Sequence, residues 1–215
     1  MKDLQNEIRA IAKSTKDSER NILIASIIAE ALRQIGQDPI LVGGAAVEFY
    51  TQGGYSTADI DMVTPGGPAL EQAMKALGFE KFGKDFFSES LKVYVEFPST
   101  HLKTEERFNS IKINQVELKI ISIEDLIVDR LCSYKFWNSE IDGINALLLM
   151  EAETLDQARL KKRATLEQVA DAYEGLCKIQ EIVIRKKLAP EMAEQLLKNL
   201  QKAMVKIKET TKKNG

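Results

Sequence analysis

Long hydrophobic runs are missing from this sequence of 215 residues. The longest apolar stretch, residues 22–31, is interrupted by Ser26 and Glu30, whereas a membrane-spanning helix needs about 20 apolar residues. The sequence also starts without an apolar segment behind basic residues, which is the pattern of a secretory signal peptide. We therefore expect a cytoplasmic protein that does not interact with a membrane.

Thiol and imidazole groups are scarce as well. The sequence contains two cysteines, Cys132 and Cys177, and one histidine, His101. These residues lack the close spacing of zinc ligands, and cysteines of a cytoplasmic protein are expected to stay reduced. We therefore expect neither a disulfide-stabilised fold, nor a zinc site, nor catalysis by His101.

Neither sign of charge dominates, since the sequence contains 30 Lys and Arg and 32 Asp and Glu. Hydrophobic residues make up 44% of the sequence. This composition is typical of a globular protein with a core. From residue 153 onward, however, 14 basic residues face 9 acidic ones. Such a basic segment is one way to bind RNA, although a solvated helical surface is the simpler explanation.

Periodic patterns of both helices and strands occur up to residue 121, and only helical patterns follow. In the first part we predict helices over 3–13, 18–35, 44–52 and 69–77, and strands over 39–42, 60–63, 79–82, 92–97, 110–113 and 116–121. In the second part we predict helices over 122–137, 139–150, 154–161, 165–187 and 190–209. Ser122 is the expected N-cap of the first of these, with Asp125 as its capping carboxylate.

These elements predict an α+β fold with two parts. Residues 1–121 are expected to form a small mixed β-sheet core with flanking helices. Residues 122–215 are expected to form a helical C-terminal region. Oligomeric state does not follow from the sequence.

Two aspartates, Asp59 and Asp61, stand two positions apart at the start of a predicted strand. Alternate side chains of a strand share a face, so the two carboxylates repel each other unless a cation lies between them. Oxygen ligands are the ligands that Mg²⁺ prefers, and protein-bound Mg²⁺ usually also binds substrate phosphates. The pair therefore predicts a magnesium site for a phosphate-bearing substrate.

A third carboxylate would complete such a site, because a two-metal site needs several carboxylate ligands. Glu96 is the preferred choice, since it stands between apolar residues at the end of the predicted strand 92–97. Glu117 occupies a similar position on a later predicted strand and is the competing choice.

Gly43 and Gly44 follow the apolar run 40–42 and precede a predicted helix. Helix N-termini offer free N–H groups and a partial positive charge that suit phosphate, and glycine lets the phosphate approach the backbone closely. A glycine pair alone is common in tight turns. Its place between a strand and a later Asp-x-Asp makes it more specific, and we predict that Gly43 and Gly44 bind the substrate phosphates.

This order of motifs resembles the nucleotidyltransferase superfamily related to DNA polymerase beta. More narrowly, residues 42–47, Val-Gly-Gly-Ala-Ala-Val, and residues 56–61, Ser-Thr-Ala-Asp-Ile-Asp, are similar to the minimal nucleotidyltransferases of the AbiEii toxin type. The similarity continues into residues 121–127 and covers roughly residues 38–150.

The resemblance implies Mg²⁺-dependent transfer of a nucleotide from an NTP to a hydroxyl group of RNA, such as tRNA, or of a protein. It also implies a role in a toxin–antitoxin or phage-defence system. By the same resemblance, Arg130, Lys135 and Asp142 are expected near the nucleotide. Fourteen residues separate Gly44 from Asp59, which is long for the superfamily, and Arg130 replaces the usual lysine. A catalytically inactive binding or antitoxin protein with this fold is therefore the alternative hypothesis.

Overall fold

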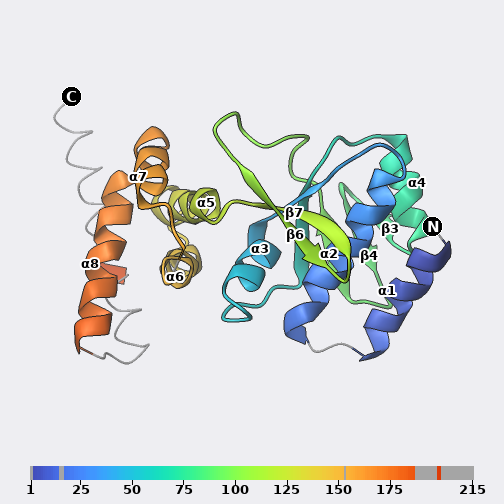
Figure 1. The fold of residues 1–215 in the computed structure, drawn as a ribbon, viewed down its shortest axis with the longest axis horizontal. Coiled ribbons are helices and arrows are strands. Elements are labelled where there is room, and N and C mark those ends of the chain that lie inside the picture. The colour runs from blue at the N-terminus through green and yellow to red at the C-terminus, as the bar shows by residue number, and fades with distance from the viewer. Residues whose placement is uncertain (1, 15–16, 153, 187–197, 200–215) are drawn as a thin grey trace. The chain divides into compact units, whose positions relative to one another are not determined.

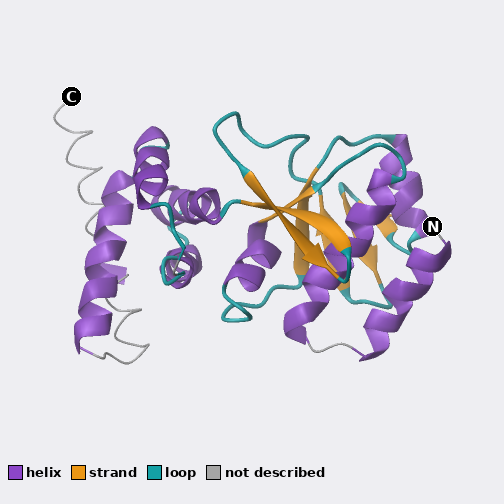
Figure 2. Ribbon diagram, in the orientation of Figure 1, coloured by secondary structure: helices purple, strands orange, loops and turns teal. Residues whose placement is uncertain are grey.

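The computed structural model of the chain describes residues 2–14, 17–152, 154–186, 198 and 199. It divides into two compact units, Met1–Ser122 and Ile123–Gly215. All strands in the described residues belong to the first unit, and the described part of the second is built from helices (Figure 2). The predicted α+β fold class is therefore confirmed, whereas the assignment of two domains, 1–121 and 122–215, stays a prediction.

Within the described chain, the first unit contains one sheet of seven strands in the order β3-β4-β5-β2-β1-β7-β6. Their bounds are β1 Ile40–Val42, β2 Asp59–Val63, β3 Glu80–Phe82, β4 Asp85–Ser88, β5 Val93–Glu96, β6 Phe108–Ile113 and β7 Val116–Ile121. The central strand β2 runs antiparallel to β1 and parallel to β5, and β1 runs parallel to β7. The sheet is therefore mixed, as predicted.

Four described helices accompany this sheet, namely α1 Lys2–Ser14, α2 Asp17–Arg33, α3 Gly43–Tyr50 and α4 Pro68–Ala76. Figure 1 shows α1 and α2, both blue, lying side by side. On α2, Ile24, Ile28 and Leu32 recur at helical spacing, and all three are fully buried. This helix therefore supplies a continuous apolar stripe to the core of the first unit.

The two faces of the sheet differ in polarity. On β2, Ile60 and Met62 are fully buried, whereas Asp59 and Asp61 are half-exposed. The side chains of a strand alternate between faces, so one face is packed into the core. The other, called the open face below, is more exposed around the two aspartates. Tyr94 of β5, paired with Asp59, shares this open face and is 38% exposed.

The described helices of the second unit are α5 Ile123–Phe136, α6 Glu140–Leu149, α7 Gln157–Leu166 and α8 Ala170–Lys186. Among the helices that the structure describes, none combines the length and apolar character needed to cross a membrane. The helix predicted over 190–209 lies outside the described residues, except at positions 198 and 199.

Some predicted elements were misplaced. Strand β4 (Asp85–Ser88) was not predicted, because it is short and its strand conformation depends on pairing with β3 on one side and β5 on the other. Helix α7 was predicted over 154–161 but begins at Gln157, because the Asp156 side chain accepts a hydrogen bond from the Arg159 backbone N–H at 2.9 Å and caps the helix there. Helix α8 begins at Ala170, and not at 165.

Asp125 has a role beside the predicted one as a capping carboxylate, which stays a prediction. Its side chain is fully buried and accepts hydrogen bonds from two arginines of α7, from Arg163 Nε at 2.8 Å and from Arg159. Arg163 is only 3% exposed. The carboxylate therefore ties α5 to α7 through a buried ion pair, which the local sequence at the start of α5 does not indicate.

We expect Asp125→Asn to lower the free energy of unfolding by about 3–5 kcal/mol, because it removes the fully buried carboxylate that pairs with two largely buried guanidinium groups. Asp171→Asn is the matched control, since Asp171 pairs with Lys135 at 2.5 Å but is 57% exposed. That change should cost less than about 1 kcal/mol. Urea unfolding of both variants measures the difference, and equal losses would contradict this role for Asp125.

Candidate active site

The candidate site is built around the junction of β1 and α3. Gly43 begins α3 with a φ of +63°, in the left-handed region. A Cβ atom at this position would lie 1.9 Å from Oδ2 of Asp61 and 2.7 Å from its Cγ. No side chain can occupy that space, so the Asp61 carboxylate contacts the backbone at the tip of α3.

Gly44 has a similar but looser contact. Its Cβ would lie 3.1 Å from Cβ and Oγ1 of Thr57. Thr57 belongs to the segment that leads into β2, and its Oγ1 accepts a hydrogen bond from the Asp59 backbone N–H at 3.2 Å. The two glycines therefore allow both the Asp-x-Asp strand and the segment before it to approach the helix tip.

Strand register brings the predicted acids together. Asp61 pairs with Val42 on β1 and with Glu96 on β5. Paired residues in neighbouring strands project to the same face, so Asp59, Asp61 and Glu96 all lie on the open face, close to the tip of α3.

Glu117 lies elsewhere. On β7 it precedes Lys119, which pairs with Ile40 at the start of β1. The tip of α3 follows the opposite end of β1, beyond Val42. The register therefore places Glu96, and not Glu117, beside the two aspartates.

The described residues contain no group of three or more His, Cys, Asp or Glu side chains arranged to hold a metal ion. Lys84 lies beside one of the acids, with its ammonium 3.7 Å from Glu96 Oε2 and 3.9 Å from Asp85 Oδ1. Mg²⁺ usually takes only one or two protein carboxylates and completes its shell with water and phosphate. The neighbouring carboxylates of Asp59 and Asp61 fit that requirement without a third ligand.

Arg130 and Asp142, both in the second unit, bind each other. Nη1 of Arg130 lies 2.7 Å from Asp142 Oδ1, and Nη2 lies 2.5 Å from Asp129 Oδ2. Burial opposes the charged guanidinium most strongly, but the two aspartates more than offset it and raise the pKa of Arg130. The Arg130 charge is therefore held by two carboxylates within this unit.

Lys135 is engaged in the same way. Its ammonium lies 2.5 Å from Asp171 Oδ1 and 2.7 Å from the Gln168 carbonyl, so it links α5 to the start of α8. The expected roles of Arg130, Lys135 and Asp142 in nucleotide binding stay predictions.

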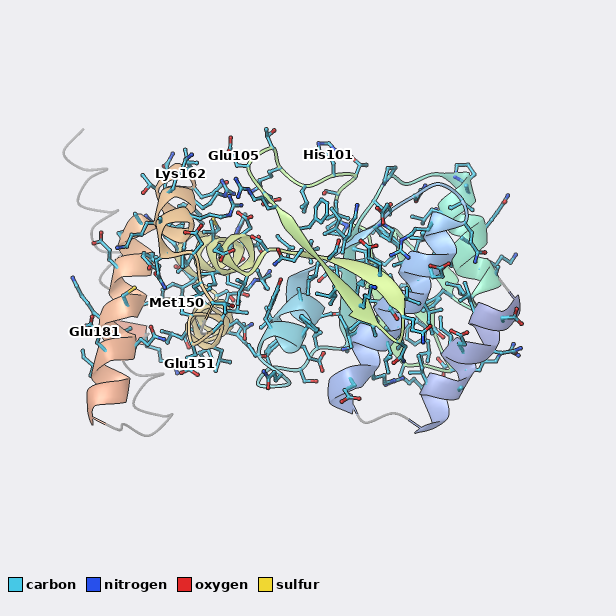
Figure 3. The ribbon with its side chains drawn as sticks, viewed as in Figure 1. His101, Glu105, Met150, Glu151, Lys162 and Glu181 are labelled. Atoms are coloured by element: carbon cyan, nitrogen blue, oxygen red, sulfur yellow. The ribbon has the colours of Figure 1, made fainter. Side chains whose placement is uncertain are left out.

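His101 lies on the loop between β5 and β6 (Figure 3). It is exposed, and its Nδ1 shares a hydrogen bond with Thr100 Oγ1 at 2.8 Å.

Two surface hollows are lined by residues other than Asp59, Asp61 and Glu96. One, of about 530 Å³, is lined by residues of α4, β3 and β4, and the other, of about 520 Å³, by residues of α2, α3 and the β6–β7 turn.

Two further groups lie beside the acids and were not predicted. Phe82, Phe87 and Tyr94 form an aromatic row on the open face, with ring centroids 4.6 Å apart for Phe87 and Tyr94 and 6.5 Å for Phe82 and Tyr94. Asn21 and Glu48 form a buried polar contact behind Thr57. The aromatic row forms only when β3, β4 and β5 pair, and the contact between Asn21 and Glu48 joins α2 to α3. Neither feature can therefore be predicted from the local sequence.

Comparisons with known proteins agree on one kind of protein. A family model described as "Nucleotidyltransferase of unknown function (DUF6036)" matches residues 23–187. An antigenic nucleotidyltransferase-like protein from Paracoccidioides brasiliensis has a similar structure, with a TM-score of 0.53 and 16% sequence identity over 80% of this chain and 93% of that protein. At this identity the likeness concerns the fold alone. No curated protein matches the chain.

We expect Gly43→Ala to displace the Asp61 carboxylate, because the new methyl group would occupy the space of its Oδ2. Gly36→Ala is the matched control, since Gly36 also has a positive φ of +77° but an added methyl group would have no other atom within 4 Å. Calorimetric titration with Mg²⁺ and an NTP should show lost or weakened binding for Gly43→Ala only. Equal binding by both variants would contradict the close contact.

Proposed function

Because this chain belongs to the family of nucleotidyltransferases of unknown function, we propose that it transfers a nucleotide from an NTP to an acceptor hydroxyl with Mg²⁺. The contact between the Asp61 carboxylate and the glycine tip of α3 carries this proposal. It brings a carboxylate, a group that commonly binds Mg²⁺, next to a helix N-terminus, a feature that commonly binds phosphate. Neither feature alone would suffice, since acids and glycines are common at strand ends and turns.

The chain's own groups have distinct parts in this reaction. Asp59 and Asp61 would hold the ion, and the backbone N–H groups at the start of α3 would bind the phosphates. Val42 is the N-cap of α3, and its apolar side chain makes no capping hydrogen bond. The N–H groups of a helix start suit an anion. When bound, Mg²⁺ neutralises phosphate charge and orients the acceptor hydroxyl.

Glu96 completes the set as the acid beside Asp61. The acceptor oxygen bonds to the α-phosphorus, the bond from that phosphorus to the pyrophosphate oxygen breaks, and pyrophosphate leaves. Glu96 would take the proton of the acceptor hydroxyl or act as a further ligand of the ion. Its present neighbour Lys84 is 80% exposed, so their contact is weak and easily exchanged.

The aromatic row favours RNA over protein as the acceptor. Tyr94 is the strand partner of Asp59, and Phe82 is 68% exposed. Aromatic side chains beside a phosphate-binding site provide surfaces on which bases stack. The surplus of basic residues after residue 152 supports the same choice. By its resemblance to the AbiEii type, the proposed setting is a toxin–antitoxin or phage-defence system.

A second candidate is a catalytically inactive protein that binds nucleotide. Two observations favour it, namely the engagement of Arg130 by two aspartates and the missing three-carboxylate cluster in the part of the chain that the structure describes. Such a protein would bind Mg²⁺ and an NTP without transferring the nucleotide.

Labelling separates these functions. The full chain is incubated with Mg²⁺, each labelled NTP and a cell lysate, and the labelled macromolecule is identified. We expect labelled RNA, and we expect Asp59→Asn and Asp61→Asn to reduce labelling by at least about 100-fold, since even residues that only orient metal ligands often contribute about 10- to 100-fold. Glu117→Gln is the matched control and should label normally.

If protein is labelled and RNA is not, the acceptor is a protein hydroxyl group. Nucleotide binding without any label would favour the inactive binding protein. Full labelling by the Asp59→Asn, Asp61→Asn double variant would exclude the proposed mechanism.

We expect Tyr94→Ala to raise the KM for acceptor RNA by about 10-fold, because stacking of one base on an aromatic ring contributes about 1–3 kcal/mol. The kcat should change little, since the ring does not touch the reacting atoms in this scheme. Phe108→Ala is the control, because Phe108 is 43% exposed on the edge strand β6, at the other side of the sheet. An unchanged KM for Tyr94→Ala would show that the aromatic row does not bind the acceptor.

A further inference from the structure

Asn21 of α2 forms a buried polar bridge. Its side-chain nitrogen donates to Glu48 Oε2 on α3 at 2.8 Å and to the Thr57 carbonyl at 2.8 Å. Asn21 is 6% exposed and Glu48 3%. An amide nitrogen carries two hydrogens, so both are used, and one side chain joins α2, α3 and the segment before β2.

This bridge ends next to the acids. The Thr57 side chain contacts Gly44, and its Oγ1 accepts the Asp59 N–H at 3.2 Å. The preceding residue of α2, Arg20, donates to the carbonyl of Leu91, just before β5. Adjacent residues of one helix therefore hold the backbone at the starts of the two strands that carry Asp59 and Glu96.

Burial of an amide and a carboxylate is costly unless both are hydrogen-bonded, and an apolar pair would join two helices at lower cost. We propose that Asn21 is a positioning residue for the transfer reaction. It fixes the distance between Thr57 and the tip of α3, so that Asp59 and Asp61 reach the same ion. This inference rests on the proposed function, because it assigns Asn21 a part in that same site.

Two variants isolate the bond to Thr57. In Glu48→Gln, the new amide oxygen still accepts from Asn21, and the Thr57 bond is kept. In the double variant Asn21→Asp, Glu48→Gln, the glutamine can donate to the new carboxylate, but that carboxylate has no hydrogen for the Thr57 carbonyl. Both variants therefore keep a hydrogen bond between α2 and α3, and they differ at Thr57.

We expect the double variant to have the melting temperature of Glu48→Gln but to bind Mg²⁺, in the presence of a non-hydrolysable NTP, about 10-fold more weakly, as variants of groups that orient metal ligands do. Its kcat for labelling should fall by a similar factor, whereas its KM for the acceptor should not change. Ser26→Ala is a further control, because Ser26 is 2% exposed on α2 and its hydroxyl donates within that helix, to the Leu23 carbonyl.

Equal Mg²⁺ affinity in the two variants would overturn the positioning role. If the double variant melts lower than Glu48→Gln, Asn21→Ser provides a second comparison, because its smaller side chain loses both bonds without adding a charge. Loss of Mg²⁺ affinity in Asn21→Ser would support the role, and unchanged affinity would refute it. Absence of labelling by the wild-type chain would refute the proposed function instead, since Mg²⁺ affinity is measured without turnover.

Discussion

The contact between Asp61 and the backbone of Gly43 is the constraint around which the candidate site is organised. The Asp61 carboxylate of β2 occupies the space in which any residue other than glycine at position 43 of α3 would have its Cβ atom. This excludes every side chain but hydrogen at position 43, and it fixes the spacing between β1, β2 and α3. The other parts of the site follow from it, because Glu96 is the strand partner of Asp61 and Thr57 leads into the same strand.

The sheet separates two tasks between its faces. Side chains on the core face, such as Ile60 and Met62, are fully buried and stabilise the first unit. Those on the open face, the acids and the aromatic row, contribute little to that core. The open face can therefore carry repelling carboxylates and exposed rings, while burial on the other face keeps the backbone in place.

Much of the fold and part of the site could be predicted from the sequence, and the limits have physical reasons. The acids at 59 and 61 and the glycines at 43 and 44 are local patterns, so their strand and helix positions followed directly. The choice between Glu96 and Glu117 depends on which strand lies beside β2, and periodicity alone does not determine strand order. Asp125 matched a capping pattern but binds arginines 34 and 38 positions away. The Asn21 bridge spans 27 and 36 positions. Local sequence patterns do not indicate contacts between residues that are so far apart in the sequence.

The parallel pairing of β1 with β7 has a consequence for biosynthesis. It joins Ile40 to Lys119 and Leu41 to Ile120, so β1 lacks one of its two neighbours until the ribosome has released nearly the whole first unit. Contacts between such distant positions form slowly, because a long loop must close first. A truncated nascent chain would contain the glycines and both aspartates, yet the strand that ends at the helix tip would still be an unpaired edge. The geometry of the candidate site is thus completed late in synthesis, after its glycines and aspartates have been made.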